Sequence, residues 1–499
     1  MRVGVVDQTI RDGPQSLYVE NMNTMPSSMV YSLAEGLGRA GFDSIDLFGW
    51  VKAVRLVRAG EDPFDHLRRV RDAVSGSRLR WGALTNQLTF AIESEEVIDL
   101  GIEVAVGCGV EEFWLFDVLY PLEAMERRAA AMARCGARVI PSIMYTLSPV
   151  HTDEWFAEKA ARFAAFPGVA GLYVEDTAGV MLPERASSLT AALRSAIGDL
   201  PLEVHFHDVN GLGVACYLEA VRAGASVVHT AVGPLGGGAS LPRLEHFLAN
   251  AAREGDIEVD VDSEVVEDVA TEAWRWSRLY GLPTGGPQEY DASIYRHQLP
   301  GGMQNSLLRQ LRDGGIEDRL GAVLAEMTRI RVEFGYPPMA TPVSQFVGVQ
   351  ATLNVMTGER FSQVPDEVCH YLLGHYGEIP GEVDQGVLDR VSSLPRFREL
   401  EGWQPPQDSV ADLRARFGSH LSDRELVLRR LCSEQELAKL RHSRGEDHPE
   451  QQLVGRSAIE IASTLLANDL LDEAEIVDRS NRYRLRRHRQ VISPGMKSS

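Results

Sequence analysis

Eight short apolar runs, separated by helix-like stretches, fill the first half of the chain and restrict the folds that it can adopt. The stretches 27–41, 121–136 and 183–198 carry apolar residues at spacings of three and four and end near glycine, as helices do. Strands that alternate with helices in this way predict a (β/α)8 (TIM) barrel over residues 1–254. The expected strands are 3–6, 44–48, 79–84, 112–116, 138–144, 171–174, 202–206 and 226–231.

A doubly wound open sheet is the alternative arrangement for alternating strands and helices. Such a sheet normally carries a glycine-rich phosphate-binding turn after its first strand. The turn after residues 3–6 reads TIRDGPQSL, which has no GxGxxG pattern. The barrel is therefore favoured.

The second half of the chain has a different pattern. From residue 255 the sequence is acidic and mostly helical, and we expect a helical domain over residues 255–405 that completes the barrel mouth, with the turn at 300–302 entering the mouth. A proline-rich stretch at 403–407 marks the next boundary. Residues 406–499 are expected to form a small helical C-terminal unit with a basic tail, SNRYRLRRHRQ. The predicted fold class is α/β, a TIM barrel followed by a mainly helical C-terminal domain.

Composition excludes several classes of function. The net charge of −21 argues against non-specific binding to nucleic acid or to anionic membranes, because both need excess Lys and Arg. The five cysteines form no CxxC pair, so neither a disulfide framework nor a zinc-thiolate site is expected. The N-terminus lacks an apolar signal core, and no apolar run reaches the roughly 18 residues of a membrane span. We expect a cytoplasmic protein.

Polar residues follow several of the apolar runs at the end where a barrel places its active site. Asp12 follows the first run, Glu175 and Asp176 close the sixth, and His205 and His207 close the seventh. Side chains alternate along a strand, so both imidazoles point to the same side. Two imidazoles and a distant carboxylate are suitable donors for a divalent metal. We expect the barrel to gather these residues at one mouth.

Several separated motifs resemble one known family. The opening DQTIRDGPQSL resembles the DTTLRDxHQS signature of biotin-dependent carboxyltransferases, and YTLSPVHT, VEDTAGVMLP, VHFHD, YRHQLPGGM and TPVSQFVGVQATLNVMTGERF follow in that family's order. The resemblance covers residues 1–442. It is strongest to the free-standing subunits, namely the α subunit of oxaloacetate decarboxylase and the central subunit of methylmalonyl-CoA:pyruvate transcarboxylase. Pyruvate carboxylase contains the same domain within a longer chain.

The resemblance implies a metal-binding barrel with a helical domain near its mouth. Asp12, His205 and His207 match metal ligands of that family. Arg11 matches the arginine beside the metal, and Gln15 matches a glutamine that contacts substrate. The family typically uses Zn, Mn or Co, and imidazole and carboxylate donors suit all three. Its subunits form dimers or larger rings, so we expect a homodimer.

The chain departs from the family pattern at positions that serve biotin and pyruvate. Glu175 stands where the family has a carboxylated lysine, yet it still presents a carboxylate to a metal. Asn305, beside Ser306, aligns with a proton-shuttling hydroxyl residue, and an amide cannot replace that hydroxyl. The keto-acid-binding arginine aligns near Ala83, with Asn86 retained. No MKM biotin-attachment motif occurs in the sequence, so we expect no biotinyl domain and expect any biotin to arrive on a separate carrier protein.

These features predict a metal-dependent enzyme of the carboxyltransferase family. The expected reaction is carboxyl transfer to, or decarboxylation of, a small 2-oxo acid such as oxaloacetate or pyruvate, through a metal-stabilised enolate. The candidate catalytic residues are Arg11, Gln15, Glu175 and Asn305. Two alternatives stay open. One is a biotin-independent lyase or aldolase acting on a 2-oxo acid or acyl-CoA, and the other is a catalytically silent barrel that serves as a scaffold in a carboxylase complex.

Overall fold

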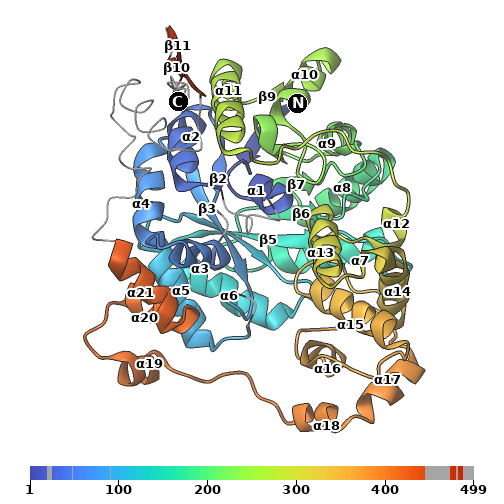
Figure 1. The fold of residues 1–499 in the computed structure, drawn as a ribbon. Helices are drawn as coiled ribbons and strands as arrows, with labels where there is room; N and C mark the ends of the chain where they lie inside the picture. The colour runs from blue at the N-terminus through green and yellow to red at the C-terminus, as the bar shows by residue number, and fades with distance from the viewer. Residues whose placement is uncertain (19–24, 48, 90, 444–472, 479–480, 487–499) are drawn as a thin grey trace, which may run out of the picture. The chain divides into compact units, whose positions relative to one another are not determined.

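The computed structural model describes residues 1–18, 25–47, 49–89, 91–443, 473–478 and 481–486. Eight parallel strands form the predicted barrel, and β1 pairs with both β8 and β2, which closes it (Figure 1). Their order around the barrel follows the chain, as short right-handed βα connections require. The strands are β1 (Arg2–Asp7), β2 (Ser44–Asp46), β3 (Arg78–Leu84), β4 (Glu112–Phe116), β5 (Arg138–Met144), β6 (Leu172–Asp176), β7 (Leu202–Phe206) and β8 (Val227–Thr230).

Amphipathic helices surround the barrel and bury their apolar faces against its strands (Figure 1). Several begin at residues that sequence rules favour: the side chains of Asp62, Ser94 and Thr152 accept hydrogen bonds from backbone N–H groups in the first turns of their helices. The helices are α1 (Asp12–Leu17), α2 (Ser27–Arg39), α3 (Trp50–Arg58), α4 (Pro63–Ala73), α5 (Glu95–Val106), α6 (Leu122–Arg134), α7 (Asp153–Ala164), α8 (Pro183–Ile197), α9 (Gly213–Arg222) and α10 (Leu244–Glu254).

A helical region follows the barrel, as predicted, and its second part is tied to the loop after β5. The side chain of Gln298 accepts hydrogen bonds from Thr146 Oγ1 and from the backbone N–H of Leu147, both at 2.9 Å. Arg331 donates to Leu147 O at 2.7 Å. The region comprises β9 (Glu258–Val259), α11 (Ser263–Tyr280), α12 (Ile294–His297), α13 (Gly301–Asp313), α14 (Leu320–Glu333), α15 (Val343–Thr357), α16 (Asp366–Leu372), α17 (Gln385–Ser392) and α18 (Pro395–Glu401).

The start of α13 packs closely against the barrel mouth. A Cβ atom added at Gly302 would lie 3.3 Å from Cα of Ser16 in α1, and one added at Gly301 would lie 3.1 Å from Cβ of Ala239 in the loop after β8. Contacts this short leave little room for a side chain, which explains the two successive glycines. The turn expected at 300–302 is instead the start of α13, with Pro300 at its N-cap, and it lies against Ser16 and Ala239.

The structure corrects the predicted boundary at residue 406. Residues Met1–Leu437 form one compact unit and Ala438–Ser499 a second. Helices α19 (Val410–Phe417) and α20 (Asp423–Leu431) therefore belong with the barrel, where they pack against α5. The guanidinium of Arg430 holds both carboxylate oxygens of Glu93, at 2.5 and 2.9 Å. This bidentate ion pair joins residues that are far apart in sequence. The proline-rich stretch at 403–407 is therefore a connection within the first unit and not a domain boundary.

The second unit is not wholly helical, contrary to our expectation. Besides the end of α21 (Glu434–Ser443), it contains β10 (Glu473–Asp478) and β11 (Asn481–Arg486), which pair in antiparallel fashion. In the sequence NRYRLR, arginines alternate with Tyr483 and Leu485, and this period of two is typical of a strand. We interpreted the segment as a tail because of its basic charge. Residues 480 and 487–490 of the predicted basic tail, and residues 444–472 of the expected helical unit, lie outside the described residues.

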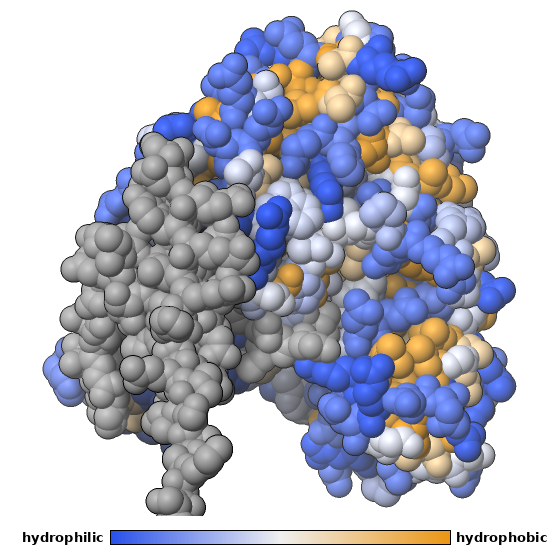
Figure 2. Space-filling model, turned by 45° about the horizontal axis from the view of Figure 1, so that its top comes forward, coloured by the Kyte–Doolittle hydropathy of each residue, from blue (hydrophilic) through white to orange (hydrophobic). Residues whose placement is uncertain are grey.

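The described surface gives no sign of a membrane-spanning segment. No helix in the described part of the chain is both long and apolar enough to cross a bilayer. On the face shown in Figure 2, hydrophobic residues gather in separate patches between hydrophilic ones.

Burial of His66 predicts a specific loss of stability in mild acid. Its ring lies in α4 with Nδ1 3.0 Å from the hydroxyl of Tyr31, and burial, reinforced by Lys52 and Arg69, lowers its pKa from 6.5 to about 3. Between these values the unfolded chain takes up a proton that the folded chain does not, so stability falls as pH falls. When the pH is lowered from 7.5 to 5, the free energy of unfolding of His66→Gln should therefore fall by about 2 kcal/mol less than that of wild type.

Urea unfolding of both proteins at the two pH values measures this difference. The other buried histidines are present in both proteins, so their contributions cancel in the comparison. Identical pH dependence in the two proteins would contradict the assignment of a neutral, buried His66.

Candidate active site

Three of the predicted site residues come together at the barrel mouth. Asp12 begins α1, His205 lies in β7, and His207 follows the end of that strand. All three are buried, and one ligand atom from each lies within 4.8 Å of the others. Nε2 of His205 is 3.2 Å from Nε2 of His207, and Oδ1 of Asp12 is 3.9 and 3.6 Å from these two nitrogens.

The hydrogen-bond partner of His207 determines its tautomer. Its Nδ1 lies 2.7 Å from the carbonyl oxygen of Ala239. A carbonyl oxygen can only accept, so Nδ1 carries the proton. In the neutral ring, Nε2 therefore presents its lone pair to Asp12 and His205.

The same reasoning applies to His205 through a second imidazole. Nε2 of His229 lies 2.9 Å from a carboxylate oxygen of Glu203, so this nitrogen donates. Burial lowers the pKa of His229 to about 4, although Glu203 opposes this shift, and burial lowers the pKa of His205 well below its usual value. Both rings are then neutral, so Nδ1 of His229 accepts a hydrogen bond from Nδ1 of His205 at 3.2 Å. Nε2 of His205 is left with a lone pair.

When both histidines are neutral, the site presents three acceptor atoms with no proton between them. Two imidazole lone pairs face each other at 3.2 Å, and a carboxylate oxygen of Asp12 lies beside them. The two imidazole lone pairs and the carboxylate oxygen repel one another, and a divalent cation between them would satisfy all three. Each histidine also donates its other ring nitrogen to a protein acceptor, as metal-ligating histidines do. The donor set therefore fits a divalent metal, and Zn, Mn and Co all suit it.

Neighbouring side chains orient Asp12 and add positive charge. Its Oδ2 accepts from the hydroxyls of Ser16 at 3.1 Å and Ser240 at 3.4 Å, which leaves Oδ1 directed at the histidines. Arg11 donates to Oδ1 at 3.0 Å, and its guanidinium lies over the ring of Trp114, 4.6 Å from the centroid. This buried arginine is therefore a fixed cation in direct contact with the cluster.

Glu175, in β6, lies at the edge of the cluster. Its Oε1 is 4.0 Å from Nε2 of His205. Its Oε2 is buried and has no hydrogen-bond partner among the described residues, and the same is true of Oε1 of Gln15 on α1. Burial raises the pKa of Glu175 to about 7, even though Arg11 lowers it. A buried carboxylate with a free oxygen beside two imidazoles is available to a further ligand.

The structure does not bring Asn305 into this cluster. Asn305 is exposed on α13, and Ser306 beside it is only half-buried. The helix itself reaches the mouth through its first residues, as described above. The structure thus brings Asp12, His205 and His207 together, with Arg11 and Glu175 adjacent to them. Asn305 faces outward.

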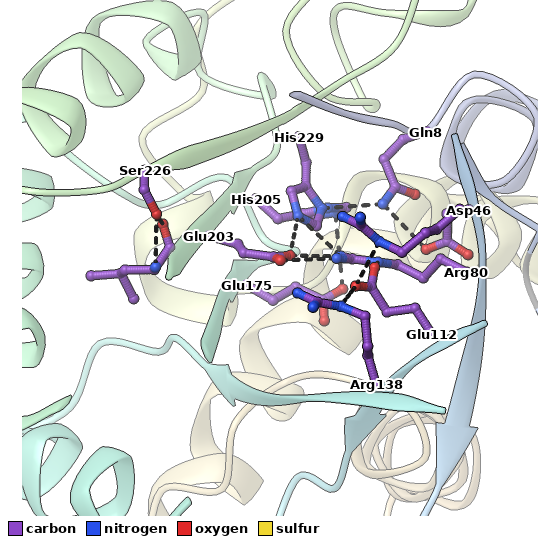
Figure 3. Close-up of polar contacts among 12 residues, drawn as sticks. Gln8, Asp46, Arg80, Glu112, Arg138, Glu175, Glu203, His205, Ser226 and His229 are labelled. Carbon is purple, nitrogen blue, oxygen red and sulfur yellow. Dashed lines mark hydrogen bonds and ion pairs between the residues drawn. The ribbon is translucent and has the colours of Figure 1, made fainter. Parts of the chain in front are cut away.

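Reasoning from sequence missed a charged network inside the barrel, next to the cluster (Figure 3). Arg80, Glu112, Glu203 and His229 are all buried and joined by hydrogen bonds and ion pairs. One signal for it was present, since Arg80, Glu203 and His229 lie within strands that are mostly apolar and Glu112 begins another. Glu203 and His205 are two residues apart in β7 and therefore share the inward face.

Comparison with known proteins matches both halves of the chain to described families. A family described as HMGL-like matches residues 2–272, which covers the barrel. A family described as a conserved carboxylase domain matches residues 294–461, which begins at the start of α12.

Among curated proteins, a pyruvate carboxylase subunit of Methanocaldococcus jannaschii is 31% identical over 414 residues, covering 82% of this chain and 71% of that protein. The 2-oxoglutarate carboxylase large subunit of Hydrogenobacter thermophilus is 27% identical over 463 residues, covering 90% and 70%. The methylmalonyl-CoA carboxyltransferase 5S subunit of Propionibacterium freudenreichii is 28% identical over 417 residues, covering 82% and 79%.

The fold also matches a solved structure. The carboxyl transferase domain of Rhizobium etli pyruvate carboxylase superposes with a TM-score of 0.79 at 23% identity, covering 96% of this chain and 83% of that one. This likeness shows the shared fold, while the sequence matches show descent. The chain belongs to the biotin-dependent carboxyltransferase family.

Proposed function

We propose that this protein is a metal-dependent enzyme that transfers a carboxyl group to, or removes one from, a small 2-oxo acid. The observation that carries the proposal is the pair of buried imidazole Nε2 atoms, 3.2 Å apart, beside the Asp12 carboxylate. Such a buried donor set is costly unless a cation is bound. Its position at the C-terminal ends of the strands is the usual place of an active site in this fold.

The names of the relatives support the substrate class. Two are carboxylases named for pyruvate and for 2-oxoglutarate, both of which are 2-oxo acids. Oxaloacetate is the simplest 2-oxo acid with which to test this class, because it can lose CO2 without a second substrate.

The chain's own residues supply binding and electrostatic stabilisation. A divalent metal held by Asp12, His205 and His207 would supply a Lewis acid for the substrate carbonyl. When the bond to a departing carboxylate breaks, CO2 leaves and its electron pair stays on the substrate as an enolate. Arg11 is held in place by Asp12 and Trp114, so it can offset that negative charge without reorganising. The amide oxygen of Gln15, which is buried and has no hydrogen-bond partner among the described residues, is available for substrate contact.

We further propose that Glu175 takes the place of the family's carboxylated lysine as a carboxylate ligand. Its free Oε2 and the 4.0 Å separation between its Oε1 and Nε2 of His205 support this role, directly or through water. A glutamate needs no prior reaction with CO2, so metal binding in this chain would not depend on bicarbonate.

Use of biotin is the point on which two versions of the function differ. A separate biotin carrier protein is the partner that family membership suggests. The exposure of Asn305 on α13 favours the alternative, a biotin-independent lyase or aldolase, because that position would then not shuttle a proton in the site.

The first prediction concerns metal content. Wild-type protein should hold about one divalent metal per chain, and His207→Ala should lose most of it, because one of three buried donors is removed. Elemental analysis after dialysis measures this, with His246→Ala, an exposed histidine, as the matched control. A metal-free wild type, or equal metal content in all three proteins, would contradict the proposal.

The second prediction concerns Glu175. Glu175→Gln keeps the shape of the side chain but removes its charge, so metal affinity should fall by about 10-fold to 100-fold. Affinity measured with and without added bicarbonate should be the same for wild type. A bicarbonate requirement would point to a carboxylated side chain elsewhere, and unchanged affinity in the variant would exclude Glu175 as a ligand.

The third prediction separates the two versions of the reaction. Metal-loaded wild type should decarboxylate oxaloacetate, and Arg11→Met should lower kcat by about 100-fold if Arg11 stabilises the enolate. The assay is run with and without free biotin. Activity that requires biotin identifies the carboxyltransferase version, activity without biotin identifies the lyase version, and absence of any turnover with 2-oxo acids rejects the substrate class.

A further inference from the structure

The charged network inside the barrel is anchored by Arg80. Its guanidinium donates from Nε to Glu112 at 2.7 Å and from both terminal nitrogens to Glu203, at 2.6 and 2.9 Å (Figure 3). The side chains of Arg80 and Glu112 are each 1% exposed, so this charge is removed from water almost completely. Burying such groups is favourable only when every one of them is partnered.

The two carboxylates on Arg80 have different surroundings. Glu203 also accepts a hydrogen bond from Nε2 of His229 at 2.9 Å, and His229 in turn accepts from His205. Glu112 instead contacts Arg138, with Nε of Arg138 3.1 Å from its Oε2. One branch of the network therefore reaches the candidate metal centre, and the other runs to the surface.

Two further contacts hold the ring of His229 in one orientation. Tyr173 stacks on it with ring centroids 4.7 Å apart and an interplanar angle of 16°. The amide nitrogen of Gln8 lies 3.1 Å from its Nδ1 and 3.2 Å from a carboxylate oxygen of Asp46. An amide nitrogen can only donate, so Nδ1 of His229 is an acceptor here too, and its one lone pair is shared between Gln8 and Nδ1 of His205.

We propose that Glu203 and His229 are positioning residues for the metal centre. The relay from Glu203 through His229 fixes the proton of His205 on Nδ1 and directs its Nε2 lone pair into the cluster. This inference rests on the proposed metal centre. It adds that Glu203 and His229, neither of which is a ligand, determine how tightly His205 binds a cation.

An entirely structural role for the network predicts something different. If the ion pairs only fill the barrel, removing either carboxylate from Arg80 should have the same consequences. If the relay acts on His205, removing Glu203 should weaken metal binding and removing Glu112 should not. The chain therefore contains its own matched control.

The experiment compares Glu203→Gln with Glu112→Gln in the full-length, metal-free protein. Each is titrated with Co²⁺, and both the dissociation constant and the visible absorption spectrum of the bound ion are recorded. Thermal unfolding of the metal-free proteins is measured in parallel. Loss of the relay should raise the dissociation constant of Glu203→Gln by about 10-fold to 100-fold and alter its spectrum, since outer partners of metal-ligating histidines have effects of this size.

The control should behave differently. Glu112→Gln should lower thermal stability while keeping the wild-type spectrum and a dissociation constant within about three-fold of wild type, because its contacts do not reach His205. Equal dissociation constants and spectra for the two variants would overturn the relay. If wild type itself binds no Co²⁺, the proposed metal centre fails, which is a separate result.

A second pair of variants keeps the test decisive if Glu203→Gln does not fold. In His229→Asn, the amide oxygen can still accept from Nδ1 of His205, whereas His229→Leu removes the acceptor. The asparagine variant should bind Co²⁺ within about three-fold of wild type, and the leucine variant about 10-fold or more weakly. Equal affinity of these two variants would also overturn the proposal.

Discussion

The buried guanidinium of Arg80 is the fixed charge on which the interior of the barrel depends. It neutralises Glu112 and Glu203, which would otherwise be two unpaired carboxylates in an apolar barrel. Because Glu203 is held as a charged acceptor, His229 must donate to it, and the proton positions of the next imidazole follow. The chemistry available at the mouth is thus set partly by groups that are buried below it.

The mouth itself is assembled from elements that are distant in sequence. The start of α1 supplies Asp12 and Arg11, while β7 and the loop after it supply the histidines. The closely packed glycines at the start of α13 allow the helical region to approach α1. The barrel and this region match two different family models, and their residues up to Leu437 form one compact unit.

Much of this arrangement could be predicted from the sequence, because barrel strands are buried on both faces and so appear as continuous apolar runs. The limits predicted for β4, β5 and β7 agree with the structure. The cluster of Asp12, His205 and His207 followed from strand alternation and from the position of active sites in barrels. The interior network could not be predicted, because it depends on side chains from four strands meeting in one register. The outward orientation of Asn305 depends on the rotation of α13, which motif alignment does not give.

The central claim is that Asp12, His205 and His207 hold one divalent metal. Crystals of the protein grown with Co²⁺ and measured at the cobalt absorption edge test it most directly, because anomalous scattering locates the ion itself. The account predicts a single strong peak in the barrel mouth, at about 2.0–2.2 Å from Nε2 of each histidine and from Oδ1 of Asp12. The absence of a peak there, or a peak bound to other side chains, would contradict it.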